Sequence, residues 1–226
     1  SGSGVITVTA PNTSTDRTIT LPDGTGTLSF GSSTAEIKSA ITLQTTADDN
    51  IGLGTNAVNS ITTGDYNLGF GLNAGTAITS GSNNIGIGAD ALLVNNTGDN
   101  NTVIGTNAMR TNTTGHKNVA VGNGALQANT TAGNSTAVGN GALTTNTTGA
   151  GNTAIGYRAL VLNTTGASNT ALGYDAMDHN TTGTENVSVG ANSLETNTTG
   201  ASNVAMGWKA LASNTTAASN TGLGNE

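Results

Sequence analysis

Glycine-rich segments are the first residues in this chain whose types and spacing could do chemistry. Residues 52–57 read G-L-G-T-N-A, and the same G-x-G-x-x-A spacing returns at 69–74 and 86–91. A dinucleotide-binding loop uses such glycines to bring the backbone close to a pyrophosphate, but it also needs a helix within a βαβ unit of about 30 residues. The short interval from one segment to the next leaves no room for that helix. We therefore expect corner glycines and no cofactor.

Ionisable side chains are the other candidates for chemistry. His116 and His179 lie at different offsets from the nearest repeated glycine, so stacking of repeats does not bring them together. Asp48, Asp49 and Asp99 lack the glycine-rich aspartate nonapeptides of calcium-binding β-rolls. No nucleophile, base and orienting group recur at a plausible spacing. We therefore predict no metal site and no enzymatic activity.

A tandem repeat must position any functional residue, because it fills most of the chain. A glycine preceded by a large apolar residue returns eleven times at a constant interval of seventeen, and we number each unit from this glycine as position 0. Position −4 is Asn in ten units, +3 is Ala in every complete unit except for Ser193, and +4 is mostly Leu or Met, while Asn-Thr-Thr-Gly occupies +7 to +10 in most later units. The position 0 glycines are Gly54, Gly71, Gly88, Gly105, Gly122, Gly139, Gly156, Gly173, Gly190, Gly207 and Gly224.

The repeat length predicts an all-β fold, a parallel β-solenoid (β-roll) of about eleven coils. Helical and leucine-rich repeats need about 20 to 47 residues, more than one unit offers. Alternation before each glycine, as at Val119 and Val121, predicts a strand of four or five residues with the residue between pointing to the other side. The Ala-Leu pair at +3 and +4 fits a second short strand or one helical turn. At about 4.8 Å per coil the rod would be about 50 Å long.

Stacking places equivalent residues in columns, and two of these columns are Asn. Each Asn amide can hydrogen-bond its copy in the next coil, which satisfies polar groups at the corners along the rod. We therefore assign position −4 a structural role. The predicted ladder includes Asn84, Asn101, Asn118, Asn152 and Asn169.

The column at position −2 carries small residues in ten of the eleven units. A solvated strand face accepts Thr, Lys or Glu, so small side chains indicate that something packs closely against them. A single thin coil also buries few large apolar residues. We predict self-association into a homotrimer through this column. The predicted interface residues are Ala120, Ala137, Ala154, Ala171 and Ala205.

Two further segments precede the repeat. Residues 1–31 alternate and contain Pro22-Asp23-Gly24, which predicts a small β-meander with strands near Ile6, Ile19 and Leu28. Residues 32–46 begin with a capping box, and Ile37 and Ile41 share one helical face, which predicts a short helical connector. Residues 47–226 form the solenoid, which stops part-way through a unit, so we expect the natural protein to continue.

Composition excludes several classes of partner. Six basic against thirteen acidic residues give a net charge of −7, which is unsuited to neutralising phosphates, so we expect no nucleic-acid partner. No apolar run approaches the roughly 18 residues of a membrane span, so we expect no membrane insertion. The chain has no Cys, which removes disulfides and thiolate metal sites from consideration.

Aromatic residues after the position 0 glycine form a candidate receptor contact. Tyr157, Tyr174 and Trp208 share position +1, with Arg158, Asp175 and Lys209 beside them. Exposed aromatic rings flanked by charge can grip a sugar or a protein. The alternative is that the same rings pack against a neighbouring chain.

The Asn-Thr-Thr triplets raise two other possibilities. Asn129, Asn146 and Asn163 are formal glycosylation acceptors, which we interpret as turn residues. Regular Thr arrays can also bind ice, but two adjacent Thr in an extended chain face opposite sides, so only one regular Thr column could project.

Parts of the chain resemble known families. Residues 152–157 (NTAIGY) resemble the repeats in the heads of trimeric autotransporter adhesins, which are left-handed parallel β-rolls assembled as homotrimers, although those repeats are usually shorter than the unit found here. The longer unit with Asn-Thr-Thr-Gly is similar to repeats in tail fibres and other virion appendages of marine and cyanobacterial phages. Residues 5–11 (VITVTAP) and 17–28 (RTITLPDGTGTL) are similar to a short module of phage fibres.

These resemblances imply a structural function. They predict a shaft segment of a trimeric fibre on a virion, such as a phage tail fibre, that supports host attachment. The alternative is a trimeric adhesin head on a bacterial or other extracellular surface that binds a host glycan or protein through the sides of the solenoid. An ice-binding solenoid is a lesser alternative.

Overall fold

The computed structural model describes residues 5–8, 17–20, 41–42 and 49–225, and it divides the chain into two units, residues 1–42 and 43–226. In the first unit, β1 (Val5–Val8) pairs antiparallel with β2 (Arg17–Thr20). The third strand predicted for the meander lies outside the described residues. Of the predicted connector only β3 (Ile41–Thr42) is described, so Ile41 belongs to a strand and not to the expected helical face.

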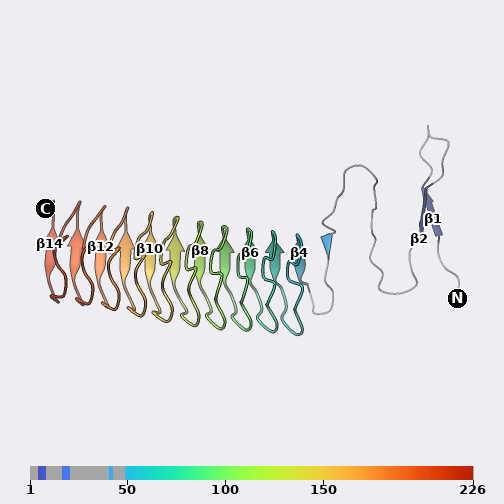
Figure 1. Cartoon of the computed structure of the whole chain (residues 1–226), viewed down its shortest axis with the longest axis horizontal. Coiled ribbons are helices and arrows are strands. Elements are labelled where there is room, and N and C mark those ends of the chain that lie inside the picture. Colours follow the sequence, from blue (N-terminus) through green and yellow to red (C-terminus); the bar gives the residue numbers. More distant parts are fainter. Residues whose placement is uncertain (1–4, 9–16, 21–40, 43–48, 226) are drawn as a thin grey trace. The chain divides into compact units, whose positions relative to one another are not determined.

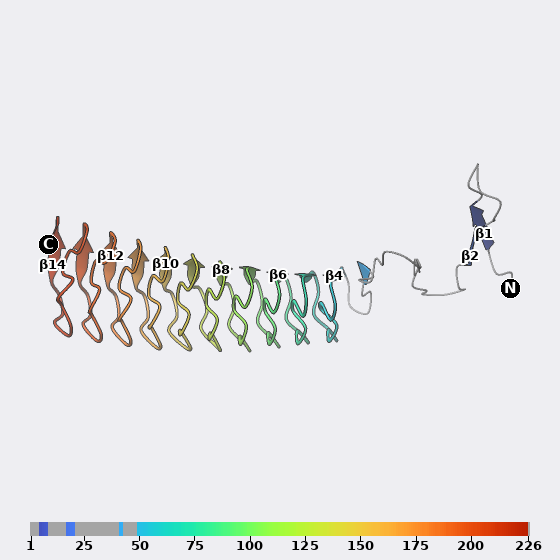
Figure 2. The same ribbon diagram turned by 45° about the horizontal axis from the view of Figure 1, so that its top comes forward.

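The second unit is a parallel β-solenoid. Each of its eleven coils contributes one strand of three residues, shorter than the four or five expected, and the strands follow one another in sequence order (Figures 1 and 2). The strands are β4 (Ile51–Leu53), β5 (Leu68–Phe70), β6 (Ile85–Ile87), β7 (Thr102–Ile104), β8 (Val119–Val121), β9 (Thr136–Val138), β10 (Thr153–Ile155), β11 (Thr170–Leu172), β12 (Val187–Val189), β13 (Val204–Met206) and β14 (Thr221–Leu223).

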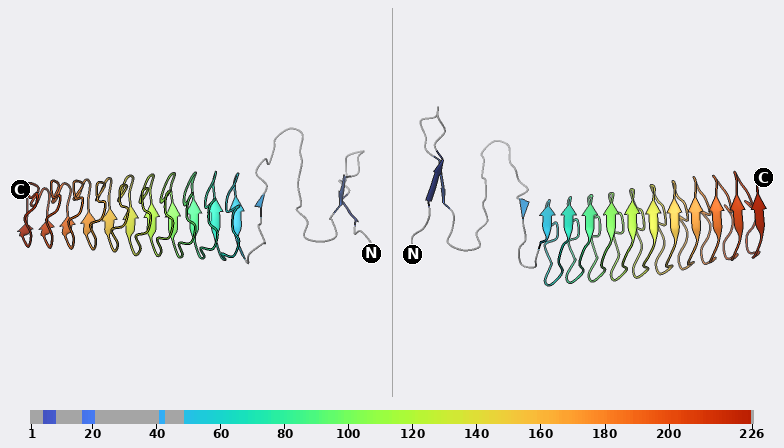
Figure 3. Two further views of the ribbon diagram at one scale, coloured as in Figure 1. Left: turned by 60° about the horizontal axis from the view of Figure 1, so that its bottom comes forward. Right: turned by 180° about the vertical axis from the view of Figure 1, so that it is seen from behind.

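Each strand of the sheet from β5 to β13 pairs with equivalent residues one repeat earlier and one repeat later in the sequence. Ala137 in β9 lies between Ala120 in β8 and Ala154 in β10, and the same offset of one repeat holds from β4 to β14. All arrows therefore point the same way along one side of the solenoid (Figure 3). This confirms the predicted β-solenoid, and we number its coils 1 to 11 from the coil that contains β4.

The strands face the opposite way from the prediction. Position −2 points into the coil, and the five alanines expected at a trimer interface are completely buried within their own chain. Positions −3 and −1 point outward and are partly exposed in the single chain. The assignment of Ala120, Ala137, Ala154, Ala171 and Ala205 to contacts between chains is therefore wrong, because no second chain can reach them.

Position −2 is small because the opposite wall of the coil lies close to it. That wall carries the Ala-Leu pair at +3 and +4, for example Ala142 and Leu143, both completely buried. Neither a strand nor a helical turn forms there. Leu143 adopts a left-handed backbone with φ of 52°, and its N–H donates to the carbonyl of Ala159 in the next coil at 3.0 Å. Both structures expected for this segment are therefore wrong, and the core is a thin stack of Ala and Leu or Met.

Glycine at position 0 is required by close stacking of successive coils. Gly173 has φ of 144°, and a Cβ atom there would lie 2.6 Å from the carbonyl oxygen of Gly190. An L side chain is strained at this φ and would also collide with the next coil. The invariant glycine therefore turns the chain out of the strand and permits the coil spacing.

Both Asn columns form hydrogen-bonded ladders inside the solenoid. At position −4, Asn101 Nδ2 donates to Asn84 Oδ1 at 3.0 Å, and the Asn101 backbone N–H donates to the same oxygen at 3.0 Å. At position +7, Asn112 Nδ2 donates to Asn95 Oδ1 at 2.5 Å. The ladders meet at Gly115, whose carbonyl accepts from both Asn101 and Asn112 at 3.0 and 2.9 Å. Buried amides are thus satisfied along the rod, as predicted for the ladder residues Asn84, Asn101, Asn118, Asn152 and Asn169.

Coils 1 and 2 have a different interior from the later coils. Position +7 is Ile61 and Ile78 there instead of Asn, and these side chains form a small cluster with Val58. A second, larger cluster of Ala, Leu, Met and Val runs from Ala91 to Ala210. The second Asn ladder therefore begins only at Asn95.

Candidate interaction surface

The outward side chains of the eleven strands form a continuous surface, which we call the outer face. It consists of positions −3 and −1 of every coil, and none of these carries a charged residue. Position −3 is Thr, Val, Ile or Leu. Position −1 is apolar in every coil: Leu53, Phe70, Ile87, Ile104, Val121, Val138, Ile155, Leu172, Val189, Met206 and Leu223.

The outer face is comparable in size to the largest apolar patch of a typical monomeric protein. Eleven strands spaced by about 4.8 Å, each three residues of about 3.3 Å wide, give an area on the order of 500 Å². This is at the upper end of the contiguous apolar patches that monomeric proteins expose. Sheet faces exposed to water usually carry polar side chains, whereas position −1 of the outer face is apolar in every coil and position −3 is Thr in five of the eleven.

The aromatic residues predicted as a receptor contact lie at the surface in one column, at position +1. The rings of Tyr157 and Tyr174 are stacked, with centroids 5.3 Å apart and planes 15° apart. Trp208 lies two coils beyond Tyr174, and the Lys209 ammonium is 4.7 Å from the centroid of its indole ring. Tyr174 and Trp208 are 54% and 49% exposed. The structure therefore brings these predicted residues into one column, which we call the aromatic rim.

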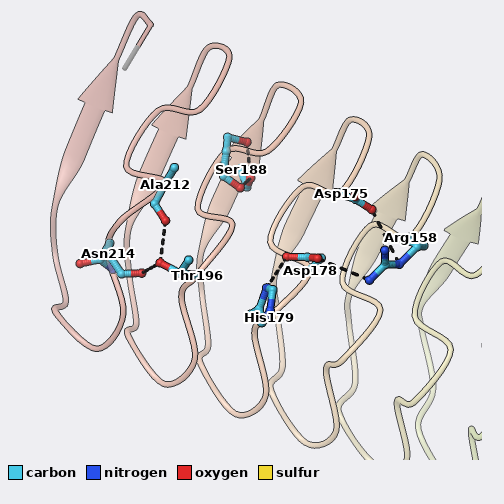
Figure 4. Close-up of polar contacts among 9 residues, drawn as sticks. Arg158, Asp175, Asp178, His179, Ser188, Thr196, Ala212 and Asn214 are labelled. Atoms are coloured by element: carbon cyan, nitrogen blue, oxygen red, sulfur yellow. Dashed lines mark hydrogen bonds and ion pairs between the residues drawn. The ribbon is translucent and has the colours of Figure 1, made fainter.

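Arg158 anchors an ion-pair group beside the aromatic rim, shown in Figure 4. Its Nε lies 3.8 Å from Asp175 Oδ1, and its Nη2 lies 3.6 Å from Asp178 Oδ2. Asp178 Oδ1 is in turn 2.7 Å from His179 Nδ1. Both Asp side chains are almost buried while Arg158 and His179 are half exposed, so the group links two adjacent coils and places a cation beside Tyr157. Neither Asp was expected from the sequence as a partner of Arg158, although Asp175 lies one repeat after it and Asp178 follows in the same coil.

One coil has two polar side chains in its core, of which Figure 4 labels Ser188. Ser188 and Ser193 replace the usual Ala at positions −2 and +3 of coil 9, and both are completely buried. Ser188 Oγ lies 2.5 Å from Ser193 Oγ and 2.8 Å from the Ser193 carbonyl oxygen. Ser193 Oγ in turn donates to the Gly190 carbonyl oxygen at 2.9 Å, so each buried hydroxyl has a backbone acceptor. We assign this pair a structural role.

The other sequence candidates remain separate. His116 and His179 are exposed at different corners of different coils. Asp48 lies outside the described residues. Over residues 49–225 and the described strands, no group of three or more His, Asp or Glu side chains is arranged to hold a metal ion. The G-x-G-x-x-A segments continue into turns rather than helices.

The Asn-Thr-Thr segments have one buried and one exposed surface. Asn129, Asn146 and Asn163 are completely buried, and their amides donate to the adjoining Asn and to their own coil. The first Thr is hydrogen-bonded to the next coil, as at Thr113, whose hydroxyl donates to the Thr130 carbonyl oxygen at 3.0 Å. The second position, which is Thr in all but one of the first ten coils, is exposed from coil to coil. One regular Thr column therefore projects, as predicted.

Comparison with protein-family models, with curated proteins and with solved structures gave no match. No helix of the described part of the chain is long and apolar enough to cross a membrane. The outer face and the aromatic rim are therefore interpreted from their own chemistry.

Proposed function

We propose that this chain is a structural shaft segment of a trimeric fibre, such as a phage tail fibre on a virion, that supports attachment to a host. In this proposal three copies pack their outer faces around a common axis, and the stacked coils give the fibre its stiffness. The chain acts mechanically and not as an enzyme.

The single observation that carries this proposal is the uncharged outer face that runs over all eleven strands. The inward column cannot join chains, so association must use side chains that are exposed in the single chain. Ile104, Leu172 and Met206 are examples of large apolar side chains that a partner would cover. The sequence resemblance to trimeric adhesin heads and to phage fibres supports a homotrimer and a virion location.

The test is the mass in solution and its response to one charge. We expect about three times the chain mass of 22.1 kDa by light scattering. Ile104→Lys places a charge on the outer face at a residue 39% exposed in the single chain, so it should leave the coil folded and abolish the trimer. Leu162→Lys is the matched control, because Leu162 is 40% exposed but lies at position +6, away from the outer face. A wild-type monomer, or a trimer that survives Ile104→Lys, contradicts the proposal.

The aromatic rim favours a second candidate function, an adhesin that binds a glycan or protein through the side of the solenoid. The rings of the aromatic rim are exposed beside Arg158 and Lys209. This supports an adhesin on a bacterial or other extracellular surface that contacts a receptor on a host cell. Binding of the isolated chain to host cells, lost in Trp208→Ala with trimer mass retained, would support the adhesin. The exposed Thr column makes ice binding a lesser alternative, which a thermal hysteresis assay tests.

A further inference from the structure

A surface built from repeats can dock on its own copy in several registers. Positions −3 and −1 recur in every coil along the outer face, so two parallel copies displaced by one coil, about 4.8 Å, still bring Val, Ile and Thr against Val, Ile and Thr. Such a displacement loses the contacts of only one coil at each end. The regular residues of the face therefore discriminate weakly between registers.

Five residues interrupt this regularity. Phe70 at −1 and Leu72 at +1 lie in coil 2 and are 53% and 52% exposed, and the aromatic rim occupies +1 in coils 7, 8 and 10. Between these two sets position +1 carries only small or polar residues: Ala89, Thr106, Asn123 and Asn140. The large apolar side chains at position +1, together with Phe70, are thus gathered at two separate heights along the rod.

We propose that Phe70, Leu72 and the aromatic rim fix the axial register between copies of this chain. The inference rests on the proposed trimer and names what aligns it. In the aligned assembly each large side chain lies level with its copies in the other two chains. A displacement by one coil brings Tyr157 of one chain level with Asn140 of the next, and at the other end it brings Phe70 level with the smaller Leu53 or Ile87.

Symmetry makes this alignment matter. Three identical contacts around an axis close into a ring only when every chain has the same height, because equal steps along the axis generate an open helix. A trimer with one displaced chain has unequal contacts and leaves outer-face residues uncovered at both ends. Residues that penalise displacement at two heights therefore favour the closed assembly.

The partner that best fits the outer face is a second copy of the same chain. The outer face offers no charge for a charged partner to recognise, and a second copy presents the same uncharged side chains at the same coil spacing. Its area, on the order of 500 Å², falls below the roughly 800 Å² per partner of a standard interface, so in this proposal the exposed side chains at position +1 add to the contact between chains.

Single cysteines report the register, because the chain contains no Cys of its own. Chains carrying Ile104→Cys and chains carrying Val121→Cys, which occupy position −1 of adjacent coils, are co-expressed and oxidised. Aligned copies give disulfides between equal positions, whereas copies displaced by one coil give a 104-to-121 disulfide, since a disulfide needs Cα atoms within about 7 Å. Arg110 and Lys117 separate the two sites, so tryptic peptides distinguish the products by mass.

The decisive variant replaces each interrupting residue by one that other coils carry at the same position. Phe70→Ile, Leu72→Thr, Tyr157→Asn, Tyr174→Asn and Trp208→Asn are combined in both cysteine backgrounds. We expect the 104-to-121 disulfide to rise about tenfold relative to equal-position disulfides, which corresponds to a register preference of about 1.4 kcal/mol. Leu162→Asn, a similar loss of apolar surface away from the outer face, should change nothing.

Each outcome decides between the two proposals. Retained trimer mass with only equal-position disulfides in the combined variant overturns the register role. A combined variant that becomes monomeric also overturns it, because the five residues then supply affinity and not alignment. A wild-type monomer without cross-links instead refutes the proposed trimer itself.

Discussion

Coils 1 and 2 fill the same cross-section as the later coils with different side chains. The early coils place Ile61 and Ile78 at +7 and glycine at −2. The later coils place Asn at +7, Leu or Met at +4 and mostly Ala at −2. A Cβ at Gly69 would lie 2.7 Å from the Ala74 carbonyl oxygen, whereas one at Gly86, in coil 3, would keep an ordinary 3.4 Å from that of Ala91.

The comparison teaches that the wall positions of a coil share one fixed space. A larger side chain at one position requires a smaller one at another, because interiors are packed without spare volume. It also separates two means of stabilisation. The early coils rely on apolar contact, while the later coils add a second set of buried amide hydrogen bonds. Exchanging residues between the two regions tests this directly.

The largest expected effect comes from placing an early-coil residue in a later coil. Asn129→Ile removes the donor to Asn112 Oδ1 and the acceptor of Asn146 Nδ2, and it adds bulk beside a filled core. Unpaired buried groups cost about 1–3 kcal/mol each, so we expect a loss of about 4 kcal/mol, measured by urea unfolding. Asn214→Ile, at a partly exposed end of the same ladder, should cost much less. Equal losses at both sites would contradict the role of burial.

The second prediction separates the glycines of position −2. Gly69→Ala should cost about 2 kcal/mol, because overpacking forces the backbone or Val58 to move. Gly86→Ala should be neutral or stabilise by about 0.5 kcal/mol, because Ala reduces the freedom of the unfolded chain. Thermal unfolding of the two variants checks the sign. Destabilisation of both by the same amount would show that coil 3 belongs with the early coils.

A third, smaller effect concerns the only coil that breaks the first Asn ladder. Ser135 stands where the other coils have Asn, and Ala132 stands three residues earlier where most coils have Gly. A Cβ at the equivalent Gly200 would lie 2.4 Å from Asn197 Oδ1 at +7 and 3.1 Å from Asn203 Nδ2 at −4, so Ala at +10 crowds both Asn columns. We expect Ser135→Asn to stabilise by about 1 kcal/mol more when combined with Ala132→Gly than alone. A double-mutant cycle in urea measures this coupling, and additive effects would refute it.

The smallest effect tests positions where the two regions do not differ. Tyr66 in coil 1 and Lys117 in coil 4 are exposed and share position +12, with left-handed φ of 57° and 56°. Replacement by Gly relieves about 1 kcal/mol of backbone strain but restores freedom to the unfolded chain. Tyr66→Gly and Lys117→Gly should therefore each change stability by less than about 0.5 kcal/mol. A clear difference between them in thermal unfolding would show that the interior of a coil also affects the stability of substitutions at its surface.

The sequence was sufficient for the repeat, the columns and the ladder. The short period excluded other repeats, and Asn at fixed positions required partners in the next coil, which Asn84 and Asn101 show. It was insufficient for the direction of the strands. Alternation separates two faces but does not say which is inside, and the large residue Val121 looks more like core than Ala120. The signal was the Ala-Leu or Ala-Met pair at +3 and +4 of most coils, since a wall that holds Leu143 and Ala142 leaves room only for small side chains opposite.

The candidate surface was predictable only in part. The shared position of Tyr157 and Tyr174 follows from the register, so their stacking could be expected. The outer face could not, because it was assigned to the interior. The pairing of Arg158 with Asp178 requires the geometry of adjacent coils.

The direction of the Asn ladders has a consequence for biosynthesis. In both ladders the later residue donates and the earlier one accepts, as in Asn67 to Asn50 and Asn129 to Asn112. A ribosome makes the earlier coil first, so a nascent coil leaving the exit tunnel meets an acceptor that is already in place. Because partners lie about one repeat apart along the chain, the rod can lengthen turn by turn behind the ribosome without waiting for its far end.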